Sequence, residues 1–457
     1  MEERLFTLRS TINVPVEKLF AWHARNGAIQ RLTPPWAPMK LVSRKGRGVD
    51  QGVEVAFDMK IAGFPCRWEA EHTQYKENQM FQDRQVKGPF GFWEHNHLFF
   101  ADGPDKSIME DRIRFKLPFG PLSLPFYGFA RKELKRMFAY RHRILKQDLE
   151  HWVSDETPMR ILVSGASGAI GSSLVPFLRT CGHEVFRLVR HTGELAADEI
   201  YWDPYQGILD LDAAGPLDAV ISLNGVDISR GKWTPEQKQR IIDSRVKTTA
   251  LLVEKMKTCA HPPKTFISSS AIGYYGEGGD RCLTETDGTG DSFISSVCRQ
   301  WEEASMGAED AGTRTIQLRI GVVLTPAGGA LERMLLPFLS CCGTRLSHGG
   351  QYMSWISMDD TLAGILHILN TQTIQGPVNL VAPNPVTNKD FTQTLGRVLG
   401  RPAPFVMPAF VAGLLWGDMG RETLLTSARV MPEKLMAHGF NFNHTRLPQA
   451  LKHLLGR

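Results

Sequence analysis

The residues that most directly suggest chemistry are three glycines at three-residue spacing, Gly165, Gly168 and Gly171. The apolar run Ile161–Val163 before them predicts a buried strand, and Ala169–Leu178 predicts a helix. A strand that turns on glycine into a helix presents backbone N–H groups and the positive end of the helix dipole to an anion. The spacing therefore predicts a dinucleotide site, in which Gly168 lets the backbone approach a pyrophosphate. A glycine-rich turn without a ligand is the alternative.

A cation follows the next predicted strand, His183–Val189, where Arg190 and His191 stand. A site that prefers NAD usually places an acidic residue here, to bind the 2′-hydroxyl of the ribose. A guanidinium can instead hold the 2′-phosphate of NADP through two parallel bonds. The sequence therefore predicts NADP(H) as the cofactor, with an Arg190 that pairs with a surface acid as the alternative.

Two further strand ends carry small polar or aromatic residues. Ala219–Leu223 predicts a buried strand that ends at Asn224, and amide side chains at such an end can lie beside the nicotinamide ribose. The segment Lys264–Gly276 predicts a strand that runs into a turn containing Ser270 and Tyr274. These positions are candidates for cofactor contact and for proton transfer.

The whole chain has the composition of a globular protein. Its 457 residues predict two or three domains, and 42% hydrophobic with 22% charged residues is ordinary for this class. The seven cysteines include no C-x-x-C pair, so we expect neither a disulfide framework nor a metal site. No signal peptide and no apolar run of membrane-spanning length is present, so we expect a cytoplasmic protein without a transmembrane segment.

Positive charge gathers in the first third of the chain. Residues 1–150 hold 25 of the 53 lysines and arginines but only 18 of the 48 acidic residues. Much of the excess lies between Arg131 and Lys146, in a segment whose apolar residues have nearly helical spacing. A long amphipathic helix with a solvated basic face explains this excess, and a basic helix for a membrane surface or a nucleic acid is the alternative. No nucleic-acid motif is present, and we expect no nucleic-acid partner.

Residues 1–155 alternate in the manner of antiparallel strands, with the basic helix at the end. This order, together with the entry segment Ile12–Phe20, resembles the START-like, polyketide-cyclase-type (SRPBCC) helix-grip fold, an α+β domain. The resemblance implies an apolar cavity between the sheet and the long helix, and hence an apolar ligand. The aromatic candidates to line it, each with core packing as the alternative, are Trp68, Phe92, Trp93, Phe99 and Phe115.

Residues 159–457 resemble the extended short-chain dehydrogenase/reductase superfamily, in its atypical epimerase-like branch of the SDR39U type. The resemblance rests on a series of motifs in order: Ser164–Gly171, Leu223–Gly225, Ser244-Arg245, Ala271–Gly276, Trp301-Glu302, Arg319–Leu324, Met353–Asp360 and Asn384–Asp390. It implies an α/β Rossmann-type, doubly wound parallel sheet with a substrate lobe after about Gly321 and a family-specific extension at about 404–455. The residues that it implies for NADP(H) binding are Gly165, Ser167, Gly168, Ala169, Ile170, Gly171, Arg190, Leu223, Asn224, Arg245 and Val323.

The resemblance fails where the family places its proton-transfer pair. Members use Tyr-x-x-x-Lys on a helix, where the lysine favours the phenolate. None of the eight tyrosines here has lysine four residues later, and the expected helix 291–306 offers Phe293, Ile294, Val297 and Cys298. Ser270 occupies the catalytic serine position. Tyr274 or Tyr275 is a candidate for a displaced acid or base, with a wall of the nicotinamide pocket as the alternative role of both tyrosines.

The sequence therefore predicts an NADP(H)-binding, epimerase-like oxidoreductase that acts on a small molecule, joined to a module that binds an apolar ligand. A non-catalytic NADP(H)-binding regulator or sensor is the first alternative, because the proton-transfer pair is missing. A carrier of apolar molecules, centred on residues 1–155, is the second. The sequence names no substrate.

Overall fold

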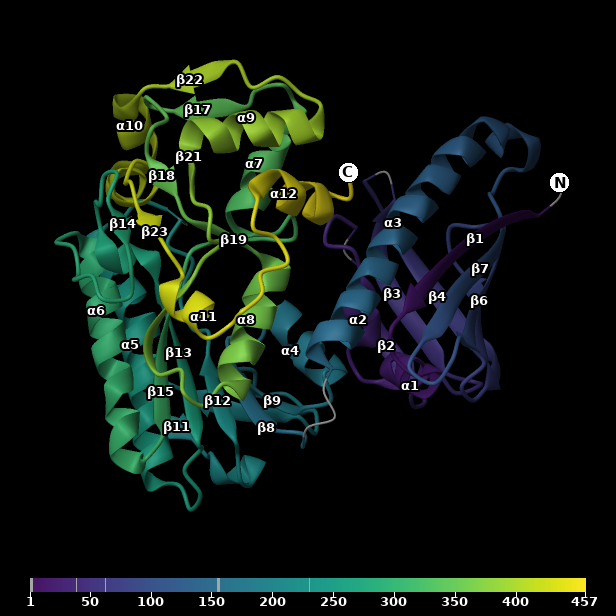
Figure 1. Ribbon diagram of the computed structural model, residues 1–457, viewed down its shortest axis with the longest axis horizontal. Helices are drawn as coiled ribbons and strands as arrows, with labels where there is room; N and C mark the ends of the chain where they lie inside the picture. The colour runs from purple at the N-terminus through teal and green to yellow at the C-terminus, as the bar shows by residue number, and fades with distance from the viewer. Residues whose placement is uncertain (1–2, 38, 62, 154–156, 230) are drawn as a thin grey trace. The chain divides into compact units, whose positions relative to one another are not determined.

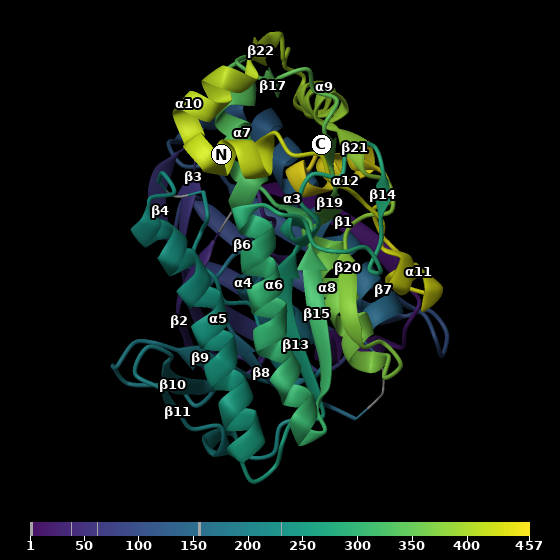
Figure 2. The same ribbon diagram turned by 90° about the vertical axis from the view of Figure 1, so that its left-hand side faces the viewer.

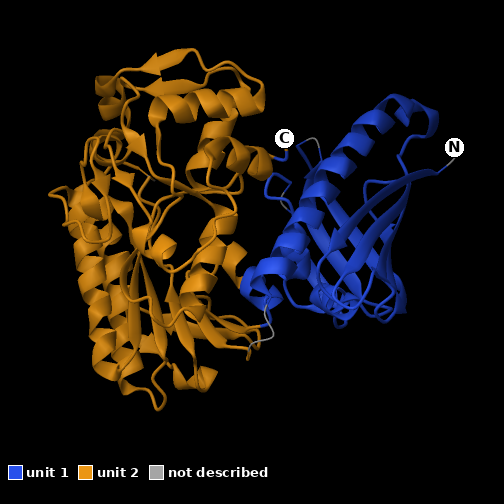
Figure 3. Ribbon diagram, in the orientation of Figure 1, with its two compact units in different colours: residues 1–156, 176–182, 456 blue, residues 157–175, 183–455, 457 orange. Residues whose placement is uncertain are grey.

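A computed structural model describes the chain except residues 1–2, 38, 62, 154–156 and 230. It divides into two compact units (Figure 3). The first comprises residues 1–156, 176–182 and 456, and the second comprises 157–175, 183–455 and 457. Each is described by itself.

The first unit is built on an antiparallel sheet of seven strands in the order β1-β7-β6-β5-β4-β3-β2 (Figure 1). The sequence pattern predicts strands at residues 5–12, 52–59, 64–75, 80–86, 92–100 and 107–117. Five of these coincide closely with observed strands, and β3 begins two residues later than expected. The second strand was not expected, because it alternates weakly and is mostly exposed. The strands are β1 (Arg4–Ile12), β2 (Lys40–Lys45), β3 (Glu54–Ile61), β4 (Phe64–Lys76), β5 (Met80–Lys87), β6 (Phe92–Ala101) and β7 (Ser107–Lys116).

Three helices accompany this sheet: α1 (Val16–Ala24), α2 (Ala28–Leu32) and α3 (Tyr127–Gln147). Helix α3 contains the basic segment expected to be helical, and it buries Leu134 and Phe138 against aromatic and aliphatic side chains of the sheet. The amphipathic pattern thus places the apolar stripe of α3 on the sheet and leaves most of its basic residues exposed.

The second unit contains an eight-stranded sheet in the order β11-β10-β9-β8-β12-β13-β15-β20. All its strands pair in parallel except β11, which is antiparallel to β10. The near-continuous apolar runs of these strands are consistent with a parallel sheet. Strands that are covered on both faces do not need to alternate apolar and polar residues. The strands are β8 (Arg160–Ser164), β9 (Glu184–Val189), β10 (Glu199–Asp203), β11 (Ile208–Leu209), β12 (Ala219–Ser222), β13 (Thr265–Ala271), β15 (Arg314–Ile320) and β20 (Gly376–Leu380).

Strand β8 lies between β9 and β12, so the order of the sheet reverses there. Ligands of doubly wound sheets bind outside the carboxyl ends of the strands at such a switch point. Helices α5 and α6 lie side by side against one face of the sheet (Figure 2). The principal helices of this Rossmann-like region are α4 (Gly171–Thr180), α5 (Pro235–Thr258), α6 (Phe293–Met306) and α8 (Met358–Asn370).

The segment Arg314–Leu324 predicts a single strand, but the structure has two strands there. The segment breaks at Gly321, and β16 (Val322–Leu324) pairs with β19 (Trp355–Ser357) outside the main sheet. A Cβ added at Gly321 would lie 2.7 Å from the Ser354 carbonyl oxygen, so only glycine fits at this break. The apolar pattern of the sequence continues through this break, so it does not reveal that the chain leaves the main sheet there.

Most of the remaining elements form a second lobe beyond the carboxyl ends of the main sheet (Figure 1). They are β14 (Cys282–Leu283), α7 (Gly329–Leu339), β17 (Thr344–Leu346), β18 (Tyr352–Met353), β21 (Val386–Thr387), α9 (Asn388–Leu399), β22 (Phe405–Met407), α10 (Ala409–Met419), β23 (Arg429–Val430) and α12 (Leu447–Leu455). Helix α11 (Glu433–Ala437) instead packs against β20 of the main sheet. Among the described residues, no helix combines the length and apolar character needed to cross a bilayer.

Candidate functional site

The glycine loop connects β8 to α4 in the way that the spacing predicts. Gly165 has φ +72°, and a Cβ there would lie 2.5 Å from the Leu223 carbonyl oxygen. A Cβ at Gly171 would lie 2.3 Å from the Gly165 carbonyl oxygen. Ser167, Gly168 and Ala169 form the exposed crest of the turn at the sheet's switch point. Close backbone packing therefore requires glycine at positions 165 and 171. The crest of the turn is exposed and so accessible to a ligand.

Arg190 follows the last residue of β9 and is exposed. It makes no hydrogen bond or ion pair with any residue that the structure describes, whereas His191 lies 3.5 Å from Glu199. The surface acid that would give Arg190 a purely structural role is thus not found among the described residues. The guanidinium is available for an anion.

The amide of Asn224 is fixed at the end of β12, because its Nδ2 donates to Ser164 Oγ at 2.7 Å and to Ser222 Oγ at 3.1 Å. Leu223 donates its N–H to the Ser164 carbonyl at 3.1 Å and lies against Gly165. These contacts bring the strand end that precedes Asn224 next to the glycine loop.

Arg245 supports this strand end from α5. Its guanidinium donates to the carbonyl oxygens of Val226 and Ile241, at 3.3 and 3.1 Å, and lies 5.1 Å from the Trp301 ring centroid. Burial lowers its pKa. Arg245 thus holds the loop after Asn224 in place through the protein's own carbonyls.

Val323 lies half-buried in the middle of β16, opposite Ile356 of β19. The segment that follows β16 returns to the glycine loop, since a Cβ added at Gly328 would lie 3.3 Å from Ala169 Cβ. The ends of β9 and β12, which flank β8 in the sheet, and the segment after β16 therefore lie around the glycine loop.

Ser270 does not have a free hydroxyl. It is buried and donates to Glu302 Oε1 at 2.6 Å. Glu302 also accepts two bonds from Arg319, Nε to Oε1 and Nη2 to Oε2, both 2.9 Å. The hydroxyl expected to take part in proton transfer is thus engaged by a buried ion pair.

Tyr275 extends this network. It accepts a bond from Arg319 Nη1 at 3.0 Å and donates to Asn379 Oδ1 at 2.6 Å. Burial raises the pKa of Tyr275 to about 12, which removes it as an acid or base near neutral pH. Burial alone would lower the pKa of Arg319, but the hydrogen bonds and charge of Glu302 raise it above its usual value.

Tyr274 is the freer of the two tyrosines. Its ring stacks on Arg319, with Cζ 3.6 Å from the ring centroid, and its hydroxyl has no hydrogen-bond partner among the described residues. Helix α6 passes nearby, with Cys298 in place of a cation. Burial raises the pKa of the Cys298 thiol to about 12, so this side chain cannot replace the missing lysine.

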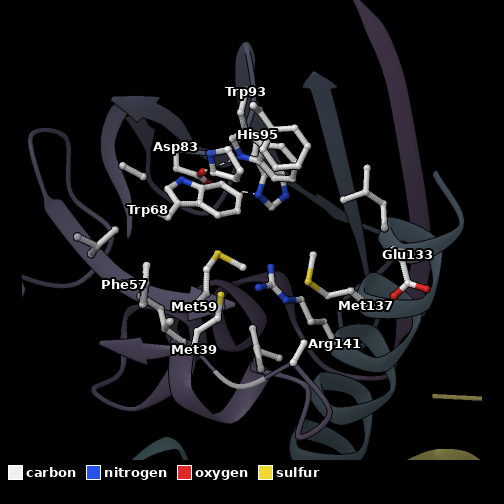
Figure 4. Close-up of a pocket in the computed structure, with 18 of the residues that line it drawn as sticks. Met39, Phe57, Met59, Trp68, Asp83, Trp93, His95, Glu133, Met137 and Arg141 are labelled. Atoms are coloured by element: carbon white, nitrogen blue, oxygen red, sulfur yellow. Dashed lines mark hydrogen bonds and ion pairs between the residues drawn. The ribbon is translucent and has the colours of Figure 1, made fainter. Parts of the chain in front are cut away.

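The first unit encloses a cavity of about 540 Å³ between its sheet and helices α2 and α3 (Figure 4). Apolar side chains dominate its wall, among them Met39, Met59 and Met137. Of the five aromatic residues expected to line it, Trp68 and Trp93 do so.

The other three expected aromatics lie elsewhere. Phe99 and Phe115 are buried in the cores beside α1 and α3, and Phe92 packs between Arg84 and Arg114. The strand alternation alone could not separate residues that face a cavity from residues that fill a core.

One wall of the cavity carries a cluster of histidines and carboxylates that was not predicted from the sequence. His95 Nδ1 lies 3.1 Å from Asp83 Oδ2, and His97 Nε2 lies 3.3 Å from the same oxygen. The opposite ring nitrogens, His95 Nε2 and His97 Nδ1, lie 2.9 and 3.0 Å from Asp111 Oδ1. Burial alone would lower the pKa of His95, but Asp83 and Asp111 raise it to about 9.

A buried arginine shares this cavity. Arg141, on α3, projects into the space opposite Trp68 (Figure 4). Its Nε is buried without a hydrogen-bond partner, and the guanidinium makes no ion pair with any described residue. Burial lowers its pKa. Such a group favours an anionic partner inside the cavity.

The sequence holds one local signal for the cluster. His95 and His97 are two residues apart in a predicted strand, so their side chains point to the same face. The expectation of no metal site was based on the spacing of the cysteines. That spacing gives no information about a site made of histidines and carboxylates. Asp83 and Asp111 come from neighbouring strands, and only the register β5-β6-β7 brings them beside the histidines.

Comparison with known proteins places the second unit in a family. The model of the NAD dependent epimerase/dehydratase family matches residues 161–380, and that of a domain of unknown function, DUF1731, matches residues 407–454. An epimerase family protein of Mycobacterium leprae is 39% identical over 297 residues, which cover 65% of this chain and 96% of the relative. One of Staphylococcus aureus is 33% identical over 302 residues, or 64% and 98%.

Two solved structures are similar. A nucleoside-diphosphate sugar epimerase from Corynebacterium glutamicum has a TM-score of 0.80 and 30% identity, and the match covers 99% of this chain and 90% of that one. The human epimerase family protein SDR39U1, solved with NADPH, has a TM-score of 0.59 and 32% identity, with 65% of this chain and 99% of that one covered. The long match to the first structure extends over both units.

Proposed function

The chain belongs to the NAD-dependent epimerase/dehydratase family, and we propose that its second unit binds NADP(H) and acts as an oxidoreductase on a small molecule. The observation that carries this proposal is the open glycine loop at the sheet's switch point, beside a strand that ends at an unpaired Arg190. In the proposed arrangement the loop residues Gly165–Gly171 hold the pyrophosphate, and Asn224 and Val323 flank the ribose and nicotinamide. The similar human protein was solved with NADPH, which supports the same cofactor here.

Arg190 makes the proposal testable. The additional phosphate of NADP carries about two negative charges, by analogy with other phosphomonoesters. A hydrogen bond to a charged group contributes about 1.5–3 kcal/mol, so Arg190→Ala should weaken NADPH binding about 10- to 150-fold. NADH binding should change little, because NADH lacks the phosphate.

Calorimetric titration of both cofactors into wild type and Arg190→Ala provides the test. Arg299→Ala, which removes an exposed arginine of α6, is the matched control and should leave both affinities unchanged. Equal affinity of the wild type for NADH and NADPH would rule out the NADP assignment.

A non-catalytic regulator or sensor that binds NADP(H) is the second candidate for this unit. It is favoured by the engagement of Ser270 with Glu302 and by a helix α6 that carries Cys298 where a cation is needed. We expect weak or no epimerisation of common nucleotide sugars, although the similar C. glutamicum protein is described as a nucleoside-diphosphate sugar epimerase. Robust conversion of UDP-glucose to UDP-galactose by the purified chain would contradict this expectation and favour the enzyme.

For the first unit we propose a START-like, helix-grip module that binds an apolar molecule with an anionic group. The cavity volume of about 540 Å³ lies within the range of roughly 300–1,000 Å³ that ligand pockets have. The unpaired Arg141 is the cation that would meet the anionic group.

Displacement of a fluorescent naphthalene sulfonate by dodecanoate and by dodecanol, in the full chain, tests this proposal. Arg141→Met should weaken dodecanoate binding about tenfold or more, since one charge-assisted bond is lost, and should leave dodecanol unaffected. Arg143→Met, an exposed change on the same helix, is the control. Failure of the wild type to bind either compound would argue against an apolar ligand.

A further inference from the structure

Three donor atoms in the first unit are arranged as metal ligands are. Asp83 Oδ2 lies 3.1 Å from His95 Nδ1 and 3.3 Å from His97 Nε2, and the ligand atoms of all three side chains lie within 4.8 Å of one another. Donor atoms around a tetrahedral metal at 2.0–2.1 Å are about 3.3 Å apart. Two of the separations between donor atoms therefore already match those of a coordination sphere.

The backbone fixes this arrangement. Asp83 of β5 is directly opposite His95 of β6, and His97 follows two residues later on the same face. All three side chains are mostly buried, with 3% exposure for His95, 12% for His97 and 17% for Asp83. Because they come from adjacent strands of one sheet, their positions do not depend on a loop.

A further carboxylate orients His95. Asp111 Oδ1 lies 2.9 Å from His95 Nε2 and is its hydrogen-bond partner, whereas His97 Nδ1, 3.0 Å from the same oxygen, makes no hydrogen bond with a described residue. When His95 Nε2 donates to Asp111 and the ion displaces any proton on Nδ1, the nitrogen that faces Asp83 offers its lone pair. Metal-binding histidines almost always donate their second ring nitrogen to such a partner.

Asp111 is held in turn from α3. His142 Nε2 lies 2.7 Å from Asp111 Oδ2, and His142 Nδ1 lies 2.8 Å from Ser10 Oγ. The two carboxylates, Asp83 and Asp111, supply two negative charges, which match a divalent cation when the histidines are neutral. The charge of Arg141 then remains for an anionic ligand.

The three donors also face open space. Asp83, His95 and His97 all line the cavity, whose remaining wall is mainly apolar (Figure 4). Two histidines and one carboxylate on one side of an ion leave coordination positions free on the other, as in sites where a metal contacts a substrate. A structural zinc site would instead be closed by a fourth protein ligand.

We propose that Asp83, His95 and His97 form a mononuclear site for a divalent transition metal, with its open positions toward the cavity and Asp111 as the residue that orients His95. The donors are nitrogen and carboxylate oxygen, a set that suits zinc, cobalt or ferrous iron rather than calcium or magnesium. The alternative is a network held together by protons alone. This inference does not depend on what the cavity or the second unit binds.

Titration of the chelator-treated full chain with Zn²⁺ by calorimetry, and with Co²⁺ by visible absorption, tests the site. We expect one ion per chain and a Co²⁺ spectrum with nitrogen and oxygen ligands and no thiolate charge-transfer band. Failure of the wild type to bind either ion would overturn the proposal in favour of the proton-held network. A spectrum dominated by thiolate would overturn it too.

Variants then locate the ion. His97→Gln and the nearly isosteric Asp83→Asn should each weaken Zn²⁺ binding by more than about 100-fold, and Asp111→Asn by about 10- to 100-fold. His348→Gln, which removes an exposed histidine of the second unit, should change nothing. Near-ultraviolet circular dichroism, to which Trp68 and Trp93 of the same unit contribute, is measured in parallel and reports whether each variant is folded. Unchanged Zn²⁺ affinity in folded Asp83→Asn and His97→Gln would reject these ligands.

Discussion

The two units each bury a cluster of charged side chains, and the clusters differ in what completes them. In the second unit, Glu302 receives two bonds from Arg319 and one from Ser270, all within hydrogen-bond distance. Every charge there is met by another group of the protein. Such a network positions β13, β15 and α6 relative to one another, and it leaves no group free to act on a ligand.

The first unit places its cluster on a cavity wall. Asp83, His95 and His97 contact one another and also line the cavity. Arg141 across the cavity makes no hydrogen bond or ion pair with a described residue, and its guanidinium lies 4.8 Å from the Phe138 ring centroid. An unpaired buried cation is unfavourable unless a ligand compensates it. A polar network whose groups are all satisfied within the protein therefore indicates a structural role. A polar network that faces a cavity indicates a role in binding a ligand.

The largest effect on stability is expected from a variant that breaks the buried ion pair between Glu302 and Arg319. Arg319→Met leaves Glu302 buried without its cation, and breaking such a pair costs about 3–5 kcal/mol of unfolding free energy. Arg319 is 3% and Glu302 11% exposed at the side chain. Denaturant unfolding followed by circular dichroism should show the loss. Arg299→Met, which breaks an exposed pair with Glu303, should cost no more than about 1 kcal/mol.

A double variant sharpens the result. Glu302→Leu combined with Arg319→Met removes both charges and should recover much of the stability, since apolar replacement of a buried ion pair is often neutral. A single variant as stable as the wild type would show that the network is not what holds these elements together.

A smaller effect is expected at the glycine loop. A Cβ at Gly171 would lie 2.3 Å from the Gly165 carbonyl oxygen and 2.7 Å from Ala166 Cα, both backbone atoms that must move. Overpacking of this kind costs about 1–3 kcal/mol of unfolding free energy. Because the clashing atoms belong to the loop proposed to hold the pyrophosphate, Gly171→Ala should also displace that loop and weaken NADPH binding by about tenfold or more, which corresponds to about 1.4 kcal/mol. Gly288→Ala, where an added Cβ meets nothing within 4 Å, is the control. Calorimetric affinity that is identical in wild type and Gly171→Ala would remove the loop from the cofactor site.

The next two variants distinguish a hydroxyl that stabilises the fold from a hydroxyl that takes part in proton transfer. Ser270→Ala removes one bond to Glu302 and should lower the unfolding free energy by about 1–3 kcal/mol. Tyr274→Phe should change stability by only about 0.5 kcal/mol. If a substrate is found, Tyr274→Phe should reduce kcat on the order of 100- to 10,000-fold, as loss of a general acid or base does. Full activity in the double variant would exclude both residues from proton transfer.

The glycine loop and its flanking elements could be predicted from the sequence because they are local. Gly165, Gly168 and Gly171 lie within seven residues, and their spacing follows from the turn that they must make. The same holds for helix α5, where Thr234 accepts from the Gln237 N–H at the start, as the Thr-Pro sequence indicates.

The two polar clusters could not be predicted because they are not local. Ser270, Glu302 and Arg319 come from three elements, and Ser270 alone carried a motif that suggested catalysis. Asp83 and His95 meet through strand register, which alternation does not determine. A single residue's type suggests a role, but its partners decide whether that role is available.

The smallest effect concerns a thiol at the edge of the closed network. Burial raises the pKa of Cys298 to about 12, so at pH 8 only about one thiol in ten thousand is ionised, and the thiolate is the reactive form. Cys282 and Cys342 are exposed and should react with a disulfide reagent within minutes, whereas Cys298 should react only when the structure opens. Mass spectrometry after timed labelling measures each site. Arg319→Met should accelerate labelling at Cys298 and leave Cys282 unchanged, because only the former depends on opening of the Glu302 network. Equal labelling rates at Cys298 in both proteins would show that the network, although closed in its contacts, does not control access to the core around α6.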